Sequence, residues 1–217
     1  MFPNEPKPYR AARNRLLRAE IALRRQSEKV AAMRRRLPAG GMVPQDYVFE
    51  EGDPPRKVKL SELFSDRDAV VAYSFMYGPR MAKACPMCTS MLDGLNGNAP
   101  HIAQCANLVV IAKSPIARIL EFARGRGWSN LRLLSSSDND YNRDYLGENA
   151  EGAQLPMLNV FVKRRGAMRH FYGTELLFAK SDAGQNSRHV DMIWPLWNLL
   201  DLTPQGRGAD WYPKLQY

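Results

Sequence analysis

Two cysteines, Cys85 and Cys88, stand three positions apart in the stretch ACPMCTS (residues 84–90). A C-x-x-C pair serves two kinds of chemistry, because its thiolates either exchange with disulfides or supply half of a zinc site. The spacing by itself does not distinguish the two kinds. The elements that surround the pair must therefore decide between them.

The pair lies where a buried strand ends and a helix begins. Residues 69–77 (AVVAYSFMY) form a nearly continuous apolar and β-branched run, which predicts a strand buried on both faces. A loop follows, and Pro86 suits the first position of a helix because its fixed φ and missing N–H cost nothing there. We expect this helix over residues 87–95, ended by GLNGNAP, with Cys85 at its N-cap and Cys88 one turn inside.

This position favours a reactive thiolate at Cys85. The free N–H groups of a first helical turn and the positive end of the helix dipole stabilise a charge by roughly 0.3 to 1 kcal/mol, up to about 2 in sheltered sites. One pKa unit is about 1.4 kcal/mol, so the helix alone lowers a cysteine pKa by about one unit or less, whereas C-x-x-C thiols span roughly 3.5 to 7.5. A further partner is needed, and the candidates are Cys88, Lys83 and Arg80.

The same cysteines also fit a zinc ligand set. Cys85, Cys88, His101 and Cys105 have the spacing of a C2HC finger. Against zinc, the intervening TSMLDGLNGNAP lacks the aromatic residue that such small fingers use as a core, and a strand–helix–strand body needs no metal to fold. In that body a helix separates Cys85 from Cys105, and we expect Cys105 to be a buried, small hydrophobic residue near the start of the next strand. Zinc binding stays as an alternative.

A proline marks the start of a later strand. In QLPMLNVFVKRRGAMRHF, Pro156 directly precedes a strand that turns at a glycine and returns. Thioredoxin-type folds hold a cis proline there, packed against the active-site disulfide, and cis peptide bonds are essentially confined to proline. We expect Pro156 to shape the groove beside the sulfurs and to keep a metal from bridging them, with Pro86, Met87 and Leu155 as supporting residues.

The rest of the chain alternates between strands and helices. Residues 106–113 (ANLVVIAK) predict a second buried strand, and Ser114 and Pro115 predict the N-cap and first turn of the helix IARILEFARGRGW. A short strand, a polar connection, a hairpin and an apolar helix are expected to follow at residues 131–137, 138–152, 157–173 and 190–202. The order predicts an α/β sandwich with a mixed, partly parallel sheet that a hairpin closes.

The N-terminal segment is basic. Residues 1–37 hold eleven Lys or Arg against three Glu, which is most of the net charge of +9. A seven-residue spacing predicts a helix with one apolar seam, formed by Leu16, Leu23, Val30 and Leu37. Clustered basic residues also suit a nucleic-acid arm, but no interleaved aromatic residues offer bases a stacking platform. We therefore expect a solvated helix face.

The segment LPAGGMVPQDY, rich in the helix-breaking residues Pro and Gly, separates this helix from the rest of the chain. We expect an N-terminal basic helix and linker over residues 1–42, and one domain with a C-terminal helix and tail over residues 43–217. A length of 217 residues, of which 45% are hydrophobic, suits one folded domain with an additional N-terminal helix.

The composition also predicts the compartment. No apolar run approaches the roughly 18 to 20 residues that a membrane-spanning helix needs, and the polar N-terminus has no signal-peptide pattern. We therefore expect a cytoplasmic protein that binds no membrane. Three cysteines are too few and too odd for a disulfide scaffold, which a reducing cytoplasm would not keep oxidised. A catalytic or metal-binding pair is the more consistent interpretation.

Several strings resemble the bacterial thioredoxin-like proteins classed as domain of unknown function family 899. They are YGPRMAKACPMCTSMLDGLNG, LVVIAKSPIARILEFARGRGW, LRLLSSSDNDYNRDYLGE, LPMLNVFVK and MIWPLWNLLDLTPQGRGADWYPKL. The resemblance covers almost the whole chain, including the basic helix. It implies a thioredoxin-like fold, extended in the manner of peroxiredoxins, and a dithiol–disulfide role with Cys85 and Cys88 in the place of the family's C-P-x-C pair. It implies no established substrate.

General thiol chemistry then predicts a thiol–disulfide oxidoreductase that reduces or isomerises disulfides. Cys85, the more exposed thiol, attacks a substrate disulfide as thiolate, and Cys88 resolves the mixed disulfide. The expected partners are a disulfide-bearing protein or small-molecule thiol substrate, a reductant that the sequence does not identify, and a second copy of the chain. The expected dimer forms through the N-terminal helix or the C-terminal aromatic residues, which include Trp194, Trp197 and Trp211. We expect no cofactor and no nucleic acid.

The sequence departs from two patterns of the thioredoxin-like fold. Typical thioredoxins carry a buried carboxylate in the strand before the motif, where this chain has none, so Asp93 and Tyr77 are the candidates for proton transfer. Peroxiredoxins place Thr or Ser three residues before the peroxidatic cysteine, where this chain has Ala82, and the nearby proline, Pro79, stands one residue closer than expected. A peroxidase, a zinc module, and a non-catalytic scaffold with a nucleic-acid-associated arm remain alternatives.

Overall fold

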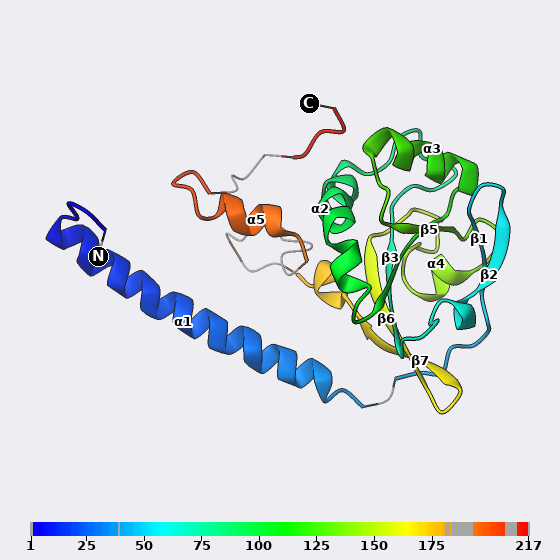
Figure 1. Cartoon of the computed structure of the whole chain (residues 1–217), viewed down its shortest axis with the longest axis horizontal. Helices are drawn as coiled ribbons and strands as arrows, with labels where there is room; N and C mark the ends of the chain where they lie inside the picture. Colours follow the sequence, from blue (N-terminus) through cyan, green and yellow to red (C-terminus); the bar gives the residue numbers. More distant parts are fainter. Residues whose placement is uncertain (1, 39, 181–182, 184–192, 207–211, 217) are drawn as a thin grey trace. The chain divides into compact units, whose positions relative to one another are not determined.

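The computed structural model describes the chain except for residues 1, 39, 181–182, 184–192, 207–211 and 217. The chain divides into two compact units, Met1–Gly40 and Gly41–Tyr217. The first unit holds one helix, α1 (Lys7–Arg35), and the second holds the sheet and the remaining helices (Figure 1).

The helix α1 confirms the predicted basic helix. It begins after Pro6 with a second proline in its first turn, and none of its residues is buried. Ion pairs join Arg10 to Glu5 and, at 2.9 Å, Arg13 to Glu20. In the part of the chain that the structure describes, no helix combines the length and apolarity that crossing a membrane requires.

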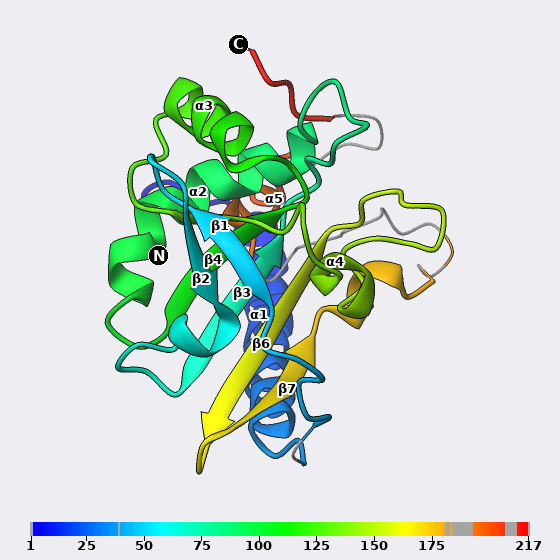
Figure 2. The same ribbon diagram turned by 90° about the vertical axis from the view of Figure 1, so that its right-hand side faces the viewer.

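A seven-stranded sheet lies at the centre of the second unit, in the order β2-β1-β5-β4-β3-β6-β7. Figure 2 shows β6 and β7 side by side at one edge of this sheet. Strands β3, β4 and β5 are parallel neighbours, whereas β6 pairs antiparallel with both β3 and β7. The bounds are β1 (Val48–Glu51), β2 (Arg56–Lys59), β3 (Ala69–Ser74), β4 (Asn107–Ala112), β5 (Arg132–Ser135), β6 (Met157–Arg164) and β7 (Ala167–Gly173). The predicted mixed sheet is confirmed.

Among the described residues, this unit also contains four α-helices and two short 3-10 helices. Their bounds are α2 (Pro86–Ile102), α3 (Ile116–Arg126), α4 (Tyr141–Asp144), α5 (Pro195–Leu200), η1 (Leu60–Glu62) and η2 (Glu175–Phe178). Each parallel connection, from β3 to β4 and from β4 to β5, contains a helix, as parallel strands require. This strand–helix–strand core, closed by the antiparallel β6–β7 hairpin, is a thioredoxin-like α/β fold.

Both faces of the sheet are buried, as the apolar strand sequences predict. Side chains alternate along β3, so Val70 and Ala72 join one core cluster while Tyr73 and, just past the strand, Phe75 join the other. The cluster that contains Tyr73 also receives residues of α2, α3 and α5. The opposite cluster is covered by the β1–β2 segment, η1 and α4. Tyr73 therefore lies on the face of the sheet that α2 covers.

The helix α2 is longer than predicted, because GLNGNAP continues it to Ile102 instead of ending it. Pro100 lies inside the helix and cannot donate a hydrogen bond to the carbonyl of Asn96. The side-chain amide of Asn130 donates to that carbonyl at 3.1 Å, and the Asn96 side chain accepts from the Asn130 N–H at 2.9 Å. A tertiary partner thus replaces the hydrogen bond that the proline removes.

Three local expectations were wrong or incomplete. Ser114 does not cap α3, because Pro115 is the N-cap residue and the Ser114 hydroxyl donates to the carbonyl of Tyr77 at 2.6 Å. The polar connection after β5 contains the helix α4, with Tyr141 fully buried. The β1–β2 hairpin was not predicted.

Two of the three C-terminal tryptophans lie in the core. Trp194 and Trp197 are buried in the core cluster that also contains Tyr73, and their rings meet edge to face at 4.7 Å. Trp211 lies outside the described residues.

Candidate functional site

The turn from β3 into α2 places the two cysteines as predicted. Cys85 is the N-cap residue of α2, and Pro86 begins the helix. The Cys85 carbonyl accepts the first helical hydrogen bonds, from the Thr89 N–H at 3.0 Å and the Thr89 hydroxyl at 2.9 Å. The Cys85 N–H donates to the carbonyl of Met76 at 3.1 Å and so ties the helix start to the end of the strand segment.

The loop between the strand and the helix is held by α3. The guanidinium of Arg118 lies 4.1 Å above the ring of Tyr77 and donates to the carbonyls of Gly78, at 3.1 Å, and Met81. These contacts fix the backbone that leads to Cys85, so the thiol position is set before any substrate arrives.

The two thiols are in very different surroundings, and the structure has them as free cysteines. Cys85 is half-buried, whereas Cys88 is only 4% exposed. A hydrogen bond from Cys88 lowers the pKa of Cys85 to about 6 against the opposing effect of burial, with further help from helix N–H groups and Tyr212. Burial raises the pKa of Cys88 well above its ordinary value, and the proximity of Cys85 raises it further. The pair thus holds one reactive thiolate and one protonated thiol.

A buried phenol accompanies the buried thiol. Tyr73, 1% exposed, points from β3 toward α2, and its side chain makes a hydrogen bond with Cys88 that lowers the pKa of that thiol. Burial raises the pKa of Tyr73 well above its ordinary value, and the charge of Cys88 adds to this effect. Tyr73 therefore stays protonated and can only donate to the sulfur.

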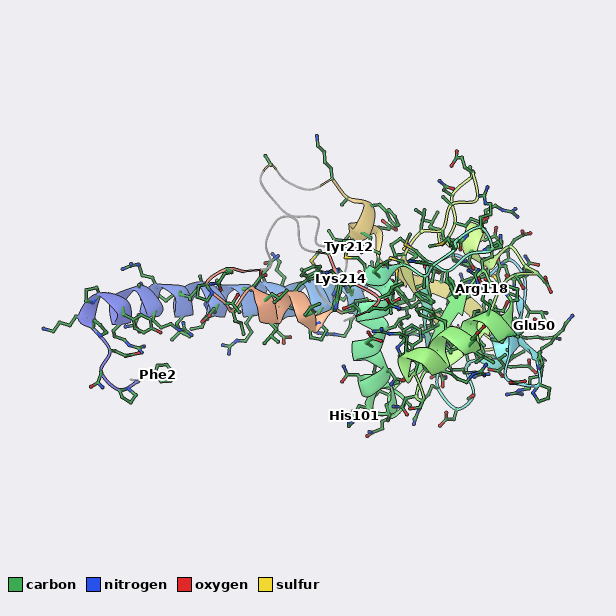
Figure 3. All side chains as sticks on the ribbon, turned by 90° about the horizontal axis from the view of Figure 1, so that it is seen from above. Phe2, Glu50, His101, Arg118, Tyr212 and Lys214 are labelled. Atoms are coloured by element: carbon green, nitrogen blue, oxygen red, sulfur yellow. The ribbon has the colours of Figure 1, made fainter. Side chains whose placement is uncertain are left out.

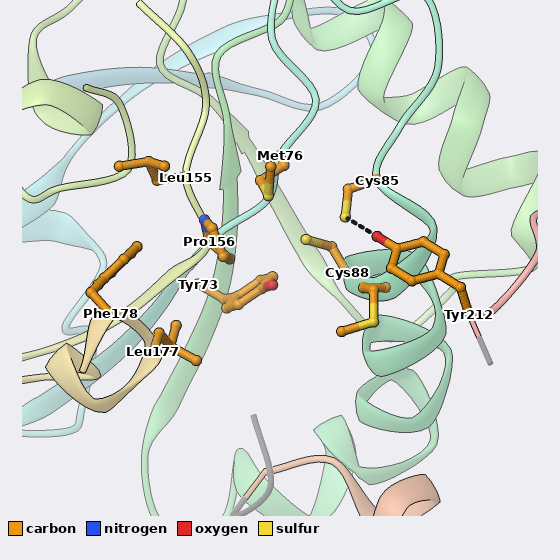
Figure 4. Close-up of a pocket in the computed structure, with 10 residues that line it drawn as sticks. Tyr73, Met76, Cys85, Cys88, Leu155, Pro156, Leu177, Phe178 and Tyr212 are labelled. Atoms are coloured by element: carbon orange, nitrogen blue, oxygen red, sulfur yellow. Dashed lines mark hydrogen bonds between the residues drawn. The ribbon is translucent and has the colours of Figure 1, made fainter. Parts of the chain in front are cut away.

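A second phenol reaches Cys85 from the C-terminal tail. The hydroxyl of Tyr212 lies 3.9 Å from the sulfur of Cys85 (Figure 4). Burial raises the pKa of Tyr212 above its ordinary value, and the adjacent Cys85 charge raises it further. Each sulfur therefore has its own phenol.

An apolar cavity of about 310 Å³ opens beside both sulfurs (Figure 4). The expected supporting residues Met87, Leu155 and Pro156 line it, while Pro86 lines a different cavity. Three further residues that the sequence did not indicate complete its apolar wall, namely Met76, Leu177 and Phe178. Pro156 thus lies in the wall of the groove beside the sulfurs.

The expectation of a cis bond at Pro156 was wrong. Among the described residues the cis peptide bond is Asp53–Pro54, and the Leu155–Pro156 bond is trans. Pro156 lines the groove through its ring and its place at the start of β6.

The charged residues proposed as thiol partners make other contacts. Arg80 is exposed and donates to the carbonyl of Glu151 at 2.6 Å. Lys83 is exposed and, together with Pro86, lines a cavity that contains neither sulfur. Neither contributes to the lowered pKa of Cys85, whose causes are Cys88, Tyr212 and the helix backbone.

The candidates for proton transfer are also occupied elsewhere. Asp93 accepts hydrogen bonds from Arg126 and, at 2.8 Å, from the indole N–H of Trp128. Tyr77 packs under Arg118. The buried group that meets Cys88 is instead Tyr73, four residues before Tyr77 on the same side of the strand segment.

The structure contradicts the zinc alternative. Cys85 and Cys88 lie at the start of α2, whereas His101 lies in its last turn, and Figure 3 shows His101 at the opposite end of the helix from Tyr212. Cys105 is exposed, not buried as expected, because it belongs to the turn after the helix and not to β4. Among the described residues, no group of His, Cys, Asp or Glu could hold a metal ion.

Sequence reasoning missed both phenols. Tyr73 had a usable signal, since strand alternation places it on the same face as the helix that follows β3. Tyr212 had none, because no local pattern indicates which tail residue returns to a site more than a hundred residues away.

Several solved structures of similar arrangement are peroxiredoxins. Peroxidoxin BcpB from Mycobacterium tuberculosis is 18% identical over 73% of this chain and 94% of its own, with a TM-score of 0.49. A cysteine-to-serine mutant of PrxQ from Xylella fastidiosa is 13% identical over 64% and 85%, with a TM-score of 0.47. Reduced 2-Cys peroxiredoxin from Plasmodium vivax is 16% identical over 76% and 96%, also with a TM-score of 0.47.

A comparison with curated proteins found no match. A family model, described as "Bacterial protein of unknown function (DUF899)", matches residues 2–217. The match spans the basic helix, the cysteine turn and the tail that carries Tyr212. The chain therefore belongs to the bacterial protein family DUF899.

Proposed function

We propose that the chain is a dithiol–disulfide oxidoreductase in which Cys85 is the nucleophile and Cys88 the resolving thiol. One observation carries the proposal. Cys85 stands half-exposed at a helix N-cap with its pKa lowered to about 6, beside a buried Cys88 whose pKa is raised. Near neutral pH such a pair offers one thiolate for attack and keeps the second sulfur protonated.

In the first step, the Cys85 thiolate attacks one sulfur of a substrate disulfide. A bond forms between Cys85 and that sulfur, the substrate S–S bond breaks, and the other substrate sulfur leaves as a thiolate that takes a proton from water. The Tyr212 hydroxyl, 3.9 Å from Cys85, lies close enough to stabilise the thiolate before the attack.

In the second step, Cys88 loses its proton and attacks the sulfur of Cys85. The Cys85–Cys88 disulfide forms, and the second substrate sulfur leaves and accepts a proton, so the substrate has gained two electrons and two protons. Tyr73 donates to the developing Cys88 thiolate but cannot serve as its base, since its own pKa is raised. A thiol reductant must then return the pair to the dithiol.

The surroundings of the thiol favour disulfide exchange over peroxide reduction. Ala82 offers no hydroxyl to a peroxide in the place where peroxiredoxins use Thr or Ser.

The test is the rate of Cys85 alkylation by iodoacetamide against pH, on reduced and metal-chelated protein. Cys85→Ser and Cys105→Ser are the controls, because Cys105 is exposed and also alkylates. We expect a midpoint near pH 6 that disappears only in Cys85→Ser. A midpoint near the ordinary cysteine value of about 8.5 would refute the proposal.

A second measurement tests exchange itself. The Cys88→Ser variant should accumulate a mixed disulfide on Cys85 when a disulfide is added, because the resolving sulfur is gone. Intact-protein mass spectrometry detects the adduct, and its absence would contradict the assigned roles.

A further inference from the structure

We infer that the disulfides which this site accepts carry an uncharged, apolar group beside the reacting sulfur. The inference rests on the proposed function, since it names the substrate class of Cys85. It comes from the walls of the cavity into which both sulfurs face.

The cavity wall is apolar almost throughout. Methionine, leucine, phenylalanine and proline side chains form it, and its polar groups are the two thiols and the phenols of Tyr73 and Tyr212. None of the described residues that line the cavity is Lys, Arg, His, Asp or Glu. A charged substrate group placed there would lose water and meet no ion of opposite sign.

Charged side chains lie around this cavity but line other cavities. In η2, Leu177 and Phe178 line the apolar cavity, while the first residue, Glu175, lines a separate cavity. Lys83 and Lys214 line another cavity, together with Pro86. Charge is thus kept off the surface that the group next to the reacting sulfur must touch.

The physical consequence is that, among disulfides with the same intrinsic reactivity, the site should prefer those whose neighbouring group is uncharged. Burying a charge without a partner is costly, whereas an apolar group gains from leaving water. Two of the wall residues are methionines, whose flexible side chains adapt to different shapes. The site should therefore select for lack of charge more than for one particular shape.

A matched pair of probes tests this preference. The dianion 3,3′-dithiodipropionate and its neutral dimethyl ester have the same disulfide and the same carbon chain. A Cys88→Ser, Cys105→Ser protein leaves Cys85 as the reacting thiol, and acid quenching with mass spectrometry gives the rate of mixed-disulfide formation at pH 7. Each rate is divided by the rate of the same probe with 2-mercaptoethanol.

We expect the normalised rate of the ester to exceed that of the dianion by about tenfold or more, as an unpaired buried charge costs at least that much. The net charge of +9 attracts the dianion and works against this result, so the comparison is stringent.

A variant locates the effect in the cavity. Phe178→Lys places a cation at the cavity rim, where the native side chain is 48% exposed and the change is tolerable for folding. It should reduce or invert the preference for the ester. Val48→Lys is the control, because it adds the same charge at a 40% exposed position in β1, which lies toward the opposite edge of the sheet from β7.

The outcomes separate the inference from the function beneath it. If neither probe reacts faster with the protein than with 2-mercaptoethanol, the proposed function fails. If both react fast with equal normalised rates, or if Val48→Lys acts like Phe178→Lys, the function stands and the substrate class is wrong. A faster dianion would overturn the inference and direct attention to Lys83 and Lys214.

Discussion

The substitution Tyr73→Phe tests how the buried thiol is controlled. It removes one hydroxyl from a fully buried position and leaves the ring in the core cluster. Tyr73 makes a hydrogen bond with Cys88 and is not among the groups that lower the pKa of Cys85. We therefore expect the attack by Cys85 to keep its rate and the resolution by Cys88 to slow.

The magnitude follows from what the hydroxyl does in each state. A hydrogen bond to a neutral group contributes about 0.5–1.5 kcal/mol, and one to a charged group about 1.5–3 kcal/mol. The difference, about 1–1.5 kcal/mol, is the extra stabilisation that Tyr73 gives to the Cys88 thiolate over the thiol. Since about 1.4 kcal/mol is a factor of ten, resolution should slow by up to about tenfold.

A single-turnover experiment measures this effect. Reduced protein is mixed with an excess of a neutral disulfide and quenched in acid, and mass spectrometry follows the mixed disulfide on Cys85. In Tyr73→Phe the adduct should appear at the wild-type rate and decay more slowly. The matched control is Tyr77→Phe, which removes another buried phenol hydroxyl from the same core cluster.

Two results would refute the reasoning. An unchanged lifetime of the mixed disulfide in Tyr73→Phe would show that the phenol does not assist Cys88. An equal slowing in Tyr77→Phe would show that general loosening of the core, and not the contact with the sulfur, causes the effect.

Three further predictions concern the same region. Asp93→Asn should lower the free energy of unfolding in urea by about 1–3 kcal/mol, because it weakens the carboxylate contacts with Arg126 and Trp128. It should leave the rate of Cys85 alkylation unchanged. A changed rate would show that Asp93 does influence the thiol pair. Tyr212→Phe should raise the pH midpoint of Cys85 alkylation by less than about one unit, since the lost bond is long at 3.9 Å; an unshifted midpoint would remove Tyr212 from the site. Finally, the lowered pKa of Cys85 contributes stability that is fully present above the unfolded value of about 8.5 and is lost as pH falls through about 6. The stability advantage of the reduced protein over Cys85→Ser in urea should therefore shrink between those pH values, and an advantage that grows as pH falls would contradict the lowered pKa.

Local signals were sufficient to predict the position of the dithiol. An apolar strand, a loop and Pro86 together specify where a helix can begin, and each acts through its immediate neighbours in the chain. The structure accordingly has Cys85 at the N-cap of α2 and Cys88 one turn inside. The two β6–β7 strands were predicted for the same reason, because their apolar runs flank a clear turn at Gly166.

Local signals failed where a distant residue supplies the missing interaction. GLNGNAP has the composition of a helix end, but Asn130 satisfies the carbonyl that Pro100 leaves free, and the helix continues. Serine is a common helix-capping residue, but the Ser114 hydroxyl donates its hydrogen bond to the carbonyl of Tyr77. In both cases a tertiary hydrogen bond overrides the local preference.

By itself, the sequence determined that a C-P-x-C pair begins a helix after a buried strand, and that one of its thiols would be the more reactive. Only the tertiary structure decided which groups stabilise the sulfurs. Arg80 and Lys83 are near in sequence, yet Arg80 donates to the Glu151 carbonyl and Lys83 lines another cavity. Tyr73 and Tyr212 instead contact Cys88 and Cys85. The physical reason is that a pKa depends on burial and on atoms within hydrogen-bond reach, and chain folding, not sequence distance, brings those atoms together.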